Sequence, residues 1–128
     1  MPTNISVIHA HDFLRATSEG ELDFETSREL LIEIVSKASG LRNYEVLLDT
    51  RKATVLMSIT DLWYLAVELL KQRKSFSRKV AILCPIEQFD HAGFFALCSG
   101  SNVEAFTSFE AAIDWLTVMT PEPENQRK

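Results

Sequence analysis

The residues best suited to covalent chemistry are two cysteines and one histidine in the second half of the chain. Cys84 ends an apolar segment, and His91 and Cys98 follow it at intervals of seven residues. A cysteine nucleophile needs a histidine base within hydrogen-bonding reach, and this spacing does not by itself bring the two together. No Gly-rich turn beside them suggests an oxyanion hole. Two buried, unreactive thiols are the simpler interpretation, so we predict no enzymatic activity.

A second candidate is a His-x-His pair near the start of the chain. His9 and His11 lie at strand spacing, with Asp12 beside them, and two imidazoles on one strand face can share a metal ion. A third and fourth ligand are not identifiable, and polar residues at a hairpin tip explain the pattern equally well. We therefore predict neither a bound metal nor a cofactor.

The charge balance restricts the partners. Lys and Arg number 13 and Asp and Glu number 18 in 128 residues, a net charge of −5. An acidic chain is a poor general binder of nucleic acid. One basic cluster could contact an anion or an acidic partner, although a solvated helix end is its usual meaning. Its members are Lys71, Arg73, Lys74, Arg78 and Lys79.

The ends of the chain and its apolar runs bear on localisation. The first twelve residues lack a basic region followed by an apolar one, which argues against a secretory signal. The longest nearly apolar stretch, residues 59–70, contains Asp61 and Glu68 and is too short to span a membrane. We expect a cytoplasmic protein with reduced thiols. Residues 1–120 are expected to form one domain, and residues 121–128 a disordered tail.

Strand patterns and helix patterns alternate along the chain. A short connection between the first two strands predicts an antiparallel hairpin. The alternation after it predicts a mainly parallel arrangement with right-handed crossovers. We therefore expect an α/β fold in which a mixed five-stranded sheet carries four helices. The expected strands cover residues 5–9, 13–18, 44–49, 79–84 and 102–106.

Each helix except the third begins with a capping signal. Thr26 and Glu29 form a capping box for the first helix, although Asp23 could cap it one turn earlier. Ser58 and Asp61 mark the start of the second helix, which we expect to reach Lys71 or Arg73. The third helix is expected over residues 87–99, and Thr107 and Glu110 open the fourth.

The second helix carries more apolar surface than one contact with a sheet requires. Leu62, Leu65 and Leu69 form one stripe, separate from the stripe that includes Trp63. If the Trp63 stripe faces the sheet, the leucine stripe points outward and predicts a symmetric dimer. The alternative is that the third helix covers Leu65 and Leu69 within one chain.

Phenylalanines in the third helix add a further possibility. A cavity between the second and third helices could hold a small apolar ligand, although core packing is the commoner use of such residues. The candidate lining residues are Trp63, Cys84, Phe89, His91 and Phe94.

Three segments together resemble the SpoIIAA-like family, an uncharacterised bacterial branch related to STAS domains and anti-sigma-factor antagonists. They are YEVLLDTRKATVLMSITDLWYLAVELL, KVAILC and AFTSFEAAIDWL, and with the order of elements they extend the similarity over residues 12–116. The resemblance implies a β/α fold without enzymatic activity, used in protein–protein switching and sometimes in ligand sensing.

The same resemblance singles out Ser58 as a candidate phospho-acceptor. In the STAS pattern a strand-end Asp is followed by Asp-Ser-[Ser/Thr]-Gly at a helix start. Asp49 matches the first Asp and Ser58 the serine, but Met57 and Thr60 replace the second Asp and the Gly. A plain helix cap is the alternative role of Ser58.

The sequence thus predicts a STAS-like interaction or regulatory module that acts as a homodimer or with a regulatory protein partner. A carrier or sensor of a small apolar ligand is the alternative.

Overall fold

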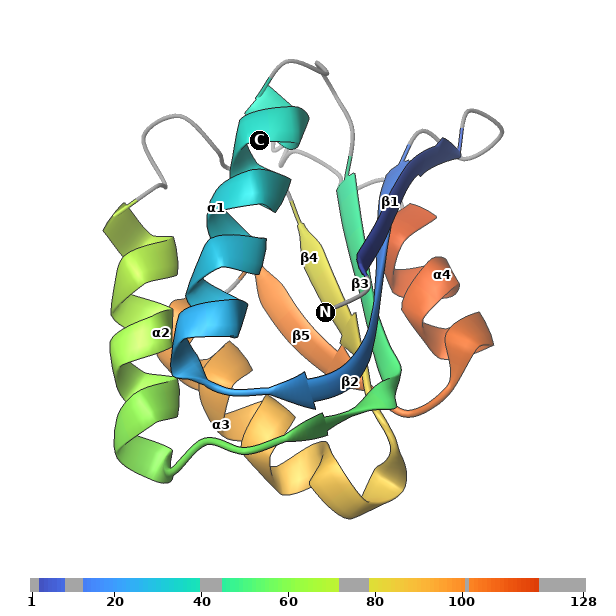
Figure 1. Cartoon of the computed structure of the whole chain (residues 1–128). Coiled ribbons are helices and arrows are strands. Elements are labelled where there is room, and N and C mark those ends of the chain that lie inside the picture. Colours follow the sequence, from blue (N-terminus) through green and yellow to red (C-terminus); the bar gives the residue numbers. More distant parts are fainter. Residues whose placement is uncertain (1–2, 9–12, 40–44, 72–78, 101, 118–128) are drawn as a thin grey trace, which may run out of the picture.

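The computed structural model describes residues 3–8, 13–39, 45–71, 79–100 and 102–117 (Figure 1). Within these residues strands and helices alternate after an initial pair of strands. The elements are β1 (Thr3–Ile8), β2 (Phe13–Leu22), α1 (Phe24–Ser39), β3 (Glu45–Val55), α2 (Ile59–Lys71), β4 (Val80–Leu83), the short 3₁₀ helix η1 (Ile86–Gln88), α3 (Phe89–Ser99), β5 (Val103–Phe106) and α4 (Phe109–Thr117).

The strands form one sheet in the order β1-β2-β3-β4-β5. Strands β2 to β5 run parallel, and β1 lies antiparallel along β2. One row of paired residues crosses the parallel part, from Leu14 through Val46 and Val80 to Val103. The parallel pairing and the four α-helices confirm the expected α/β class within the described residues.

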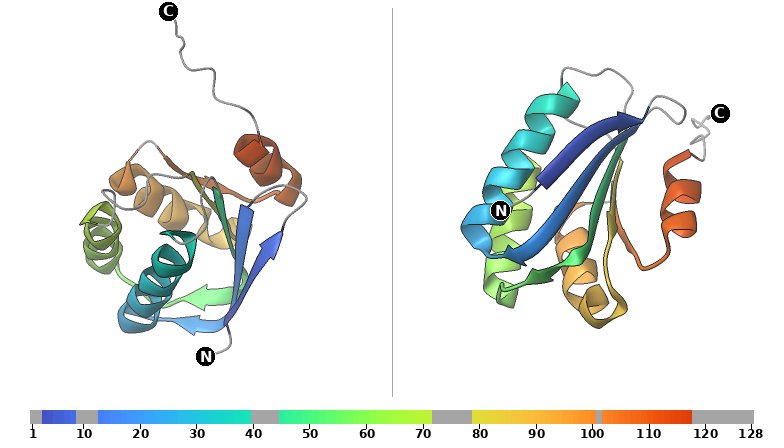
Figure 2. Two further views of the ribbon diagram at one scale, coloured as in Figure 1. Left: turned by 90° about the horizontal axis from the view of Figure 1, so that it is seen from above. Right: turned by 45° about the vertical axis from the view of Figure 1, so that its right-hand side comes forward.

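Helices cover the two faces of the sheet unequally. Figure 2 shows α1, α2 and α3 on one side and α4 alone on the other. The larger apolar core lies under the three helices and includes the row of residues that crosses the sheet. A smaller core lies under α4, formed by Leu47, Ala81, Leu83, Ala112 and Leu116.

Strands β2 and β3 are longer than their sequences suggested. We expected a strand end at Asp49 and a loop after it, but β3 continues to Val55. The extension is possible because β2 also runs on to Leu22, past an irregularity between Thr17 and Glu19, and stays paired with β3. Gly20 lies inside this extension with a φ of 84°, a conformation that glycine adopts readily.

The helix starts depend on side chains that accept backbone hydrogen bonds. Asp23, not Thr26, caps α1, because the Thr26 N–H and hydroxyl donate to Asp23 Oδ1 over 2.9 and 2.6 Å. These bonds lower the pKa of Asp23. The expected capping box of Thr107 and Glu110 is also wrong, since the Ala111 N–H donates to Ser108 Oγ over 3.3 Å. For α1 the cap is Asp23, the alternative that the sequence offered, whereas for α4 it is Ser108, the residue after the expected Thr107.

Candidate functional site

The outer side of α2 carries large exposed apolar and aromatic side chains. The expected outward orientation of Leu62, Leu65 and Leu69 is wrong, because all three are at most 5% exposed and belong to the larger core. With Ala66 they form a continuous arc of the helix that faces its own chain. The exposed large apolar and aromatic residues of the helix, which we call the α2 outer surface, are Ile59, Trp63, Tyr64 and Leu70.

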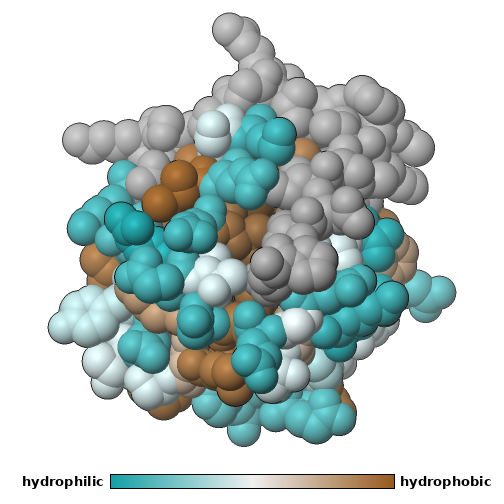
Figure 3. Space-filling view, in the orientation of Figure 1, coloured by the Kyte–Doolittle hydropathy of each residue, from teal (hydrophilic) through white to brown (hydrophobic). Residues whose placement is uncertain are grey.

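Two aromatic rings dominate the α2 outer surface. Trp63 is 49% and Tyr64 54% exposed, and their ring centroids lie 5.2 Å apart in an edge-to-face arrangement. Figure 3 shows hydrophobic and pale, intermediate side chains interspersed with hydrophilic ones on the side of the molecule where Figure 1 places α1 and α2. Tyr and Trp are enriched where proteins meet, because their rings bury much area with few rotatable bonds.

Ser58 stands exposed at the start of α2 and serves as its cap. The Asp61 N–H donates to Ser58 Oγ over 3.1 Å, and the Ser58 N–H donates to Asp61 Oδ2 over 3.3 Å. This reciprocal pair is a capping box with Asp in place of Glu. The residue before it, Met57, stands where the STAS pattern has an Asp. Its side chain is half-buried and packs against the larger core.

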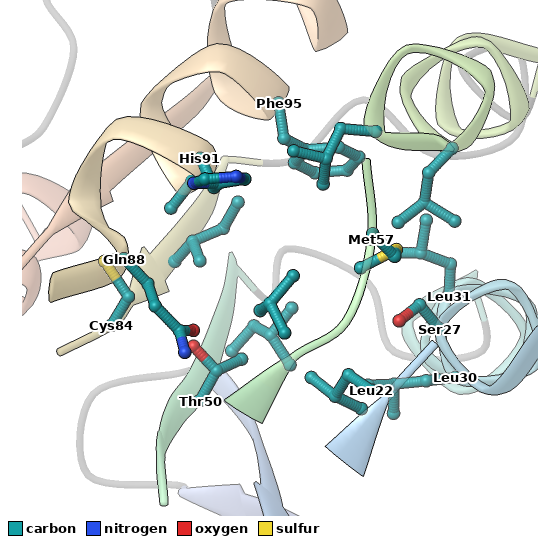
Figure 4. Close-up of a pocket in the computed structure, with 16 residues that line it drawn as sticks. Leu22, Ser27, Leu30, Leu31, Thr50, Met57, Cys84, Gln88, His91 and Phe95 are labelled. Carbon is teal, nitrogen blue, oxygen red and sulfur yellow. The ribbon is translucent and has the colours of Figure 1, made fainter. Parts of the chain in front are cut away.

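A small apolar cavity of about 70 Å³ lies between the sheet and helices α1, α2 and α3. It brings together two of the five candidate ligand residues, Cys84 and His91, as Figure 4 shows. The other three lie elsewhere. Trp63 and Phe89 are largely exposed and Phe94 packs against the core. Phe95, one residue farther along α3, lines the cavity in their place.

The chemistry of this cavity does not favour a cysteine nucleophile. Burial raises the pKa of the Cys84 thiol to about 11, so the reactive thiolate is scarce near neutral pH. The thiol points to the carbonyl oxygen of Phe106, 3.5 Å from Sγ. Cys98 is half-buried against the core and does not line the cavity. Cys98 is therefore separate from Cys84 and His91, which share the cavity wall.

Two buried polar atoms in the cavity wall have no hydrogen-bond partner within the described residues. They are Ser27 Oγ, on α1, and Gln88 Oε1, at the end of η1. Figure 4 shows Ser27 on one side of the cavity and Gln88 with Thr50 on the other. Thr50 is satisfied, because its hydroxyl donates to the carbonyl of Leu83 over 3.0 Å.

The opposite face of the sheet holds an ion-pair network that sequence reasoning missed. The carboxylate of Asp49, 5% exposed, accepts hydrogen bonds from Arg15 Nη2 at 3.0 Å and from Arg51 Nη2 and Nε at 2.9 and 3.0 Å. Burial alone would raise the pKa of Asp49, but the hydrogen bonds from Arg51 and Arg15 outweigh it and lower that pKa. Both guanidinium groups also lie over the ring of Phe109, 5.5 and 5.9 Å from its centroid.

The sequence contained only part of the signal for this network. Asp49 and Arg51 are two residues apart in a strand, which puts them on one face. Arg15 joins them only through the β2–β3 register, in which it pairs with Leu47. Asp49 therefore lies on the face of the sheet that α4 covers, whereas Ser58 caps α2 on the opposite face.

Other predicted sites fall partly outside the described residues. His9, His11 and Asp12 lie outside them, as do Arg73, Lys74 and Arg78. Lys71 pairs with Glu68 at 3.6 Å, and Lys79 Nζ donates to the Trp115 carbonyl over 2.9 Å. In the parts of the chain that are described, no three His, Cys, Asp or Glu side chains gather closely enough for a metal ion. No described helix has the length and apolar character needed to cross a membrane.

Several solved structures share this fold, and two of them illustrate the similarity. An uncharacterised protein of the DUF3478 family with a SpoIIAA-like fold, from Shewanella loihica PV-4, aligns with a TM-score of 0.59 and 20% identity, over 90% of this chain and 92% of that one. The anti-sigma factor antagonist SpoIIAA in its unphosphorylated form aligns with a TM-score of 0.58 and 13% identity, over 92% of this chain and 100% of that one.

Sequence comparisons add no further relatives. No family model matches the chain, and no curated protein matches it. The structural matches cover nearly the whole chain, and they confirm the expected SpoIIAA-like resemblance at the level of the fold. A shared fold at this identity does not carry a shared activity.

Proposed function

We propose that the chain is a non-enzymatic, STAS-like regulatory module that binds a protein partner through the α2 outer surface. The partner is either a second copy, which gives a homodimer, or a different regulatory protein. The SpoIIAA-like fold supports the general class, since one solved structure with this fold is an anti-sigma factor antagonist. We further propose that the protein works in a reducing cytoplasm, where both thiols stay free.

The observation that carries this proposal is the exposure of Trp63 and Tyr64. Contiguous exposed apolar patches, unlike isolated exposed side chains, mark sites where proteins interact. Ile59 and Leu70 extend the same surface along the helix, each about half exposed. A partner that covers these four side chains would bury the kind of aromatic and aliphatic anchors that dominate binding energy.

Site-specific photo-crosslinking in the native cell tests the proposal. A photoreactive phenylalanine analogue at Trp63 should capture a defined protein in high yield. The matched control is the same analogue at Ile32, an apolar residue of α1 that is 43% exposed and lies outside the α2 outer surface. Equal capture at both positions, or none at Trp63, would refute the proposal.

A second candidate function is the binding of a small apolar molecule in the cavity. The lining, which is mostly apolar and includes Cys84 and His91, favours it. The volume of about 70 Å³ restricts the ligand, because a dry cavity that holds benzene measures about 150 Å³. A larger ligand would need α1, α2 or α3 to move outward.

Native mass spectrometry of the protein from its own cell extract distinguishes the two functions. A protein complex at the expected mass supports the interaction module. A bound small molecule that is lost in a Leu65→Phe variant, which would fill the cavity, supports the carrier. An unliganded monomer under gentle conditions would speak against both.

A further inference from the structure

Strand β5 ends the sheet and has a free edge beside an apolar groove. Strand β4 occupies one edge of β5, and no described strand pairs with the other. Figure 2 shows β5 at the margin of the sheet, between α3 and α4. An exposed strand edge can pair with an added strand. Strands β2, β3 and β4 are paired on both edges, and β1 lies at the opposite margin of the sheet.

The backbone of β5 directs hydrogen-bonding groups away from the sheet. The N–H groups of Val80 and Cys84 donate to the carbonyls of Asn102 and Phe106 over 2.8 and 2.9 Å. Because alternate residues of a strand bond to opposite sides, Ala105 turns its N–H and its C=O outward. The Val103 C=O also faces outward, whereas the Val103 N–H donates to Gly100 over 3.4 Å.

A groove of about 450 Å³ runs beside this edge, between β5 and α3. The residues that line it are mostly small or apolar, with Glu104 as the one charged member: Phe89, Gly93, Ala96, Leu97, Gly100, Val103, Glu104 and Ala105. Leu97 is 82% exposed, the highest value among the large apolar side chains of the described chain. A Cβ built on Gly93 would meet nothing within 4 Å. A strand added about 4.8 Å from β5 would find room there for side chains.

The two faces of β5 differ in a way that selects the sequence of an added strand. Val103 and Ala105 face the larger core and α3, whereas Phe106 packs on the α4 side against Trp115. Glu104, exposed, alternates with Val103 and Ala105 and so points to the α4 side. Glu104 makes no ion pair within the described residues, and no Lys or Arg lines the groove.

We infer that the β5 edge binds an extended peptide segment in which apolar residues alternate with Lys or Arg. The segment pairs with the backbone of Ala105, as in β-strand addition. Its apolar side chains enter the groove over Gly93, and its basic side chains reach Glu104 on the other face. This site uses α3 and β5, not the α2 outer surface, and it stands whether or not α2 binds a partner.

The test uses the full chain and a fluorescein-labelled probe of alternating Lys and Val, seven residues long. On binding, amide exchange at Ala105 should slow by about tenfold or more, because its N–H gains a partner. Gly93→Leu should lower the affinity for the probe by about tenfold or more, because the new side chain fills the groove. The chain should stay folded, since that side chain enters open space. Leu97→Ser should weaken binding, whereas Ile86→Ser, at a residue 76% exposed outside the groove, should not.

Charge reversal tests the choice of partner. Glu104→Lys should weaken the binding of the Lys-Val probe and strengthen the binding of a matched Glu-Val probe. Failure of the Lys-Val probe to bind, or unchanged affinity in Gly93→Leu and Leu97→Ser, would overturn the inference. So would amide protection at Ala105 that rises with protein concentration in the absence of probe, because the edge would then belong to a second copy. Failure of photo-crosslinking at Trp63 would refute only the proposal for α2, because peptide binding at β5 does not depend on it.

Discussion

On one face of the sheet three helices cover a single apolar core, whereas on the other a lone helix lies beside an ion-pair network. Strand β3 contributes to both, with Val46 and Leu48 in the larger core and Leu47 in the smaller one. Farther along the same strand, Asp49 and Arg51 replace apolar residues on the α4 side. The apolar residues of β3 therefore alternate between the two cores, and the buried Asp49 marks where the ion-pair network begins on the α4 side.

The two faces should respond unequally to truncation, and this is the largest effect that we predict. Leu69→Ala, under the three helices, should lower the free energy of unfolding by about 2–5 kcal/mol, because a fully buried leucine leaves a cavity. Leu116→Ala, in the small core under α4, should lower it less, since nearby side chains can relax toward solvent. Urea unfolding of both variants measures the difference. An equal or larger loss at Leu116 would contradict the comparison.

Removal of the carboxylate on the α4 side should have a smaller effect. Asp49→Asn should lower the free energy of unfolding by about 1–3 kcal/mol, because the two arginines lose a charged acceptor but remain partly hydrated. Side chains of Arg15 and Arg51 are 34% and 43% exposed. Chemical denaturation at pH 7 measures this loss, and Lys52→Gln, an exposed neighbour in β3, is the control.

The contribution of Asp49 to the free energy of unfolding should decrease at low pH. The pKa of Asp49 is lower in the folded chain than the ordinary value of 3.8. Its stabilisation is therefore complete above that value and is lost as the pH falls through the lower, folded pKa. Asp23 has the same sign, so the difference between the parent and Asp49→Asn isolates Asp49. A difference that grows below pH 3.8 would refute this assignment.

Loss of a helix cap should have the smallest effect on stability. One cap on each side of the sheet can be removed, Ser58 at α2 and Ser108 at α4. Ser58→Ala should destabilise the chain by about 1 kcal/mol, and Ser108→Ala by less. Ser58 shares two hydrogen bonds with Asp61, whereas the bond from the Ala111 N–H to Ser108 is 3.3 Å long. Thermal unfolding measures both. Phosphorylated Ser58 in protein from the native host would show that this serine is also a switch.

Much of the fold followed from local patterns in the sequence. The second helix was predicted to begin after Ser58 and reach Lys71 or Arg73, and α2 covers Ile59–Lys71. The apolar segment 79–84 was predicted as a strand, and β4 covers Val80–Leu83 with every residue buried. These predictions held because a capping residue and an uninterrupted apolar run act over a few neighbouring positions.

The candidate site was harder to predict, because it depends on contacts between distant segments. Two apolar stripes of α2 were visible, but periodicity alone does not say which one faces the sheet, and the structure buries the leucines instead of Trp63. The network of Arg15 with Asp49 requires the register of two strands. The groove at β5 requires the strand order, which places β5 at the margin.

That strand order also bears on how the chain can be assembled during its synthesis. Leu14 pairs with Val46, Val46 with Val80, and Val80 with Val103, so each strand joins the one that emerged just before it. No strand has to insert between two that are already paired. Since chains fold from the N-terminus as the ribosome delivers them, the sheet can grow by accretion in a single direction. The last strand to leave the ribosome, β5, therefore ends at one margin of the sheet, and the first, β1, lies at the other.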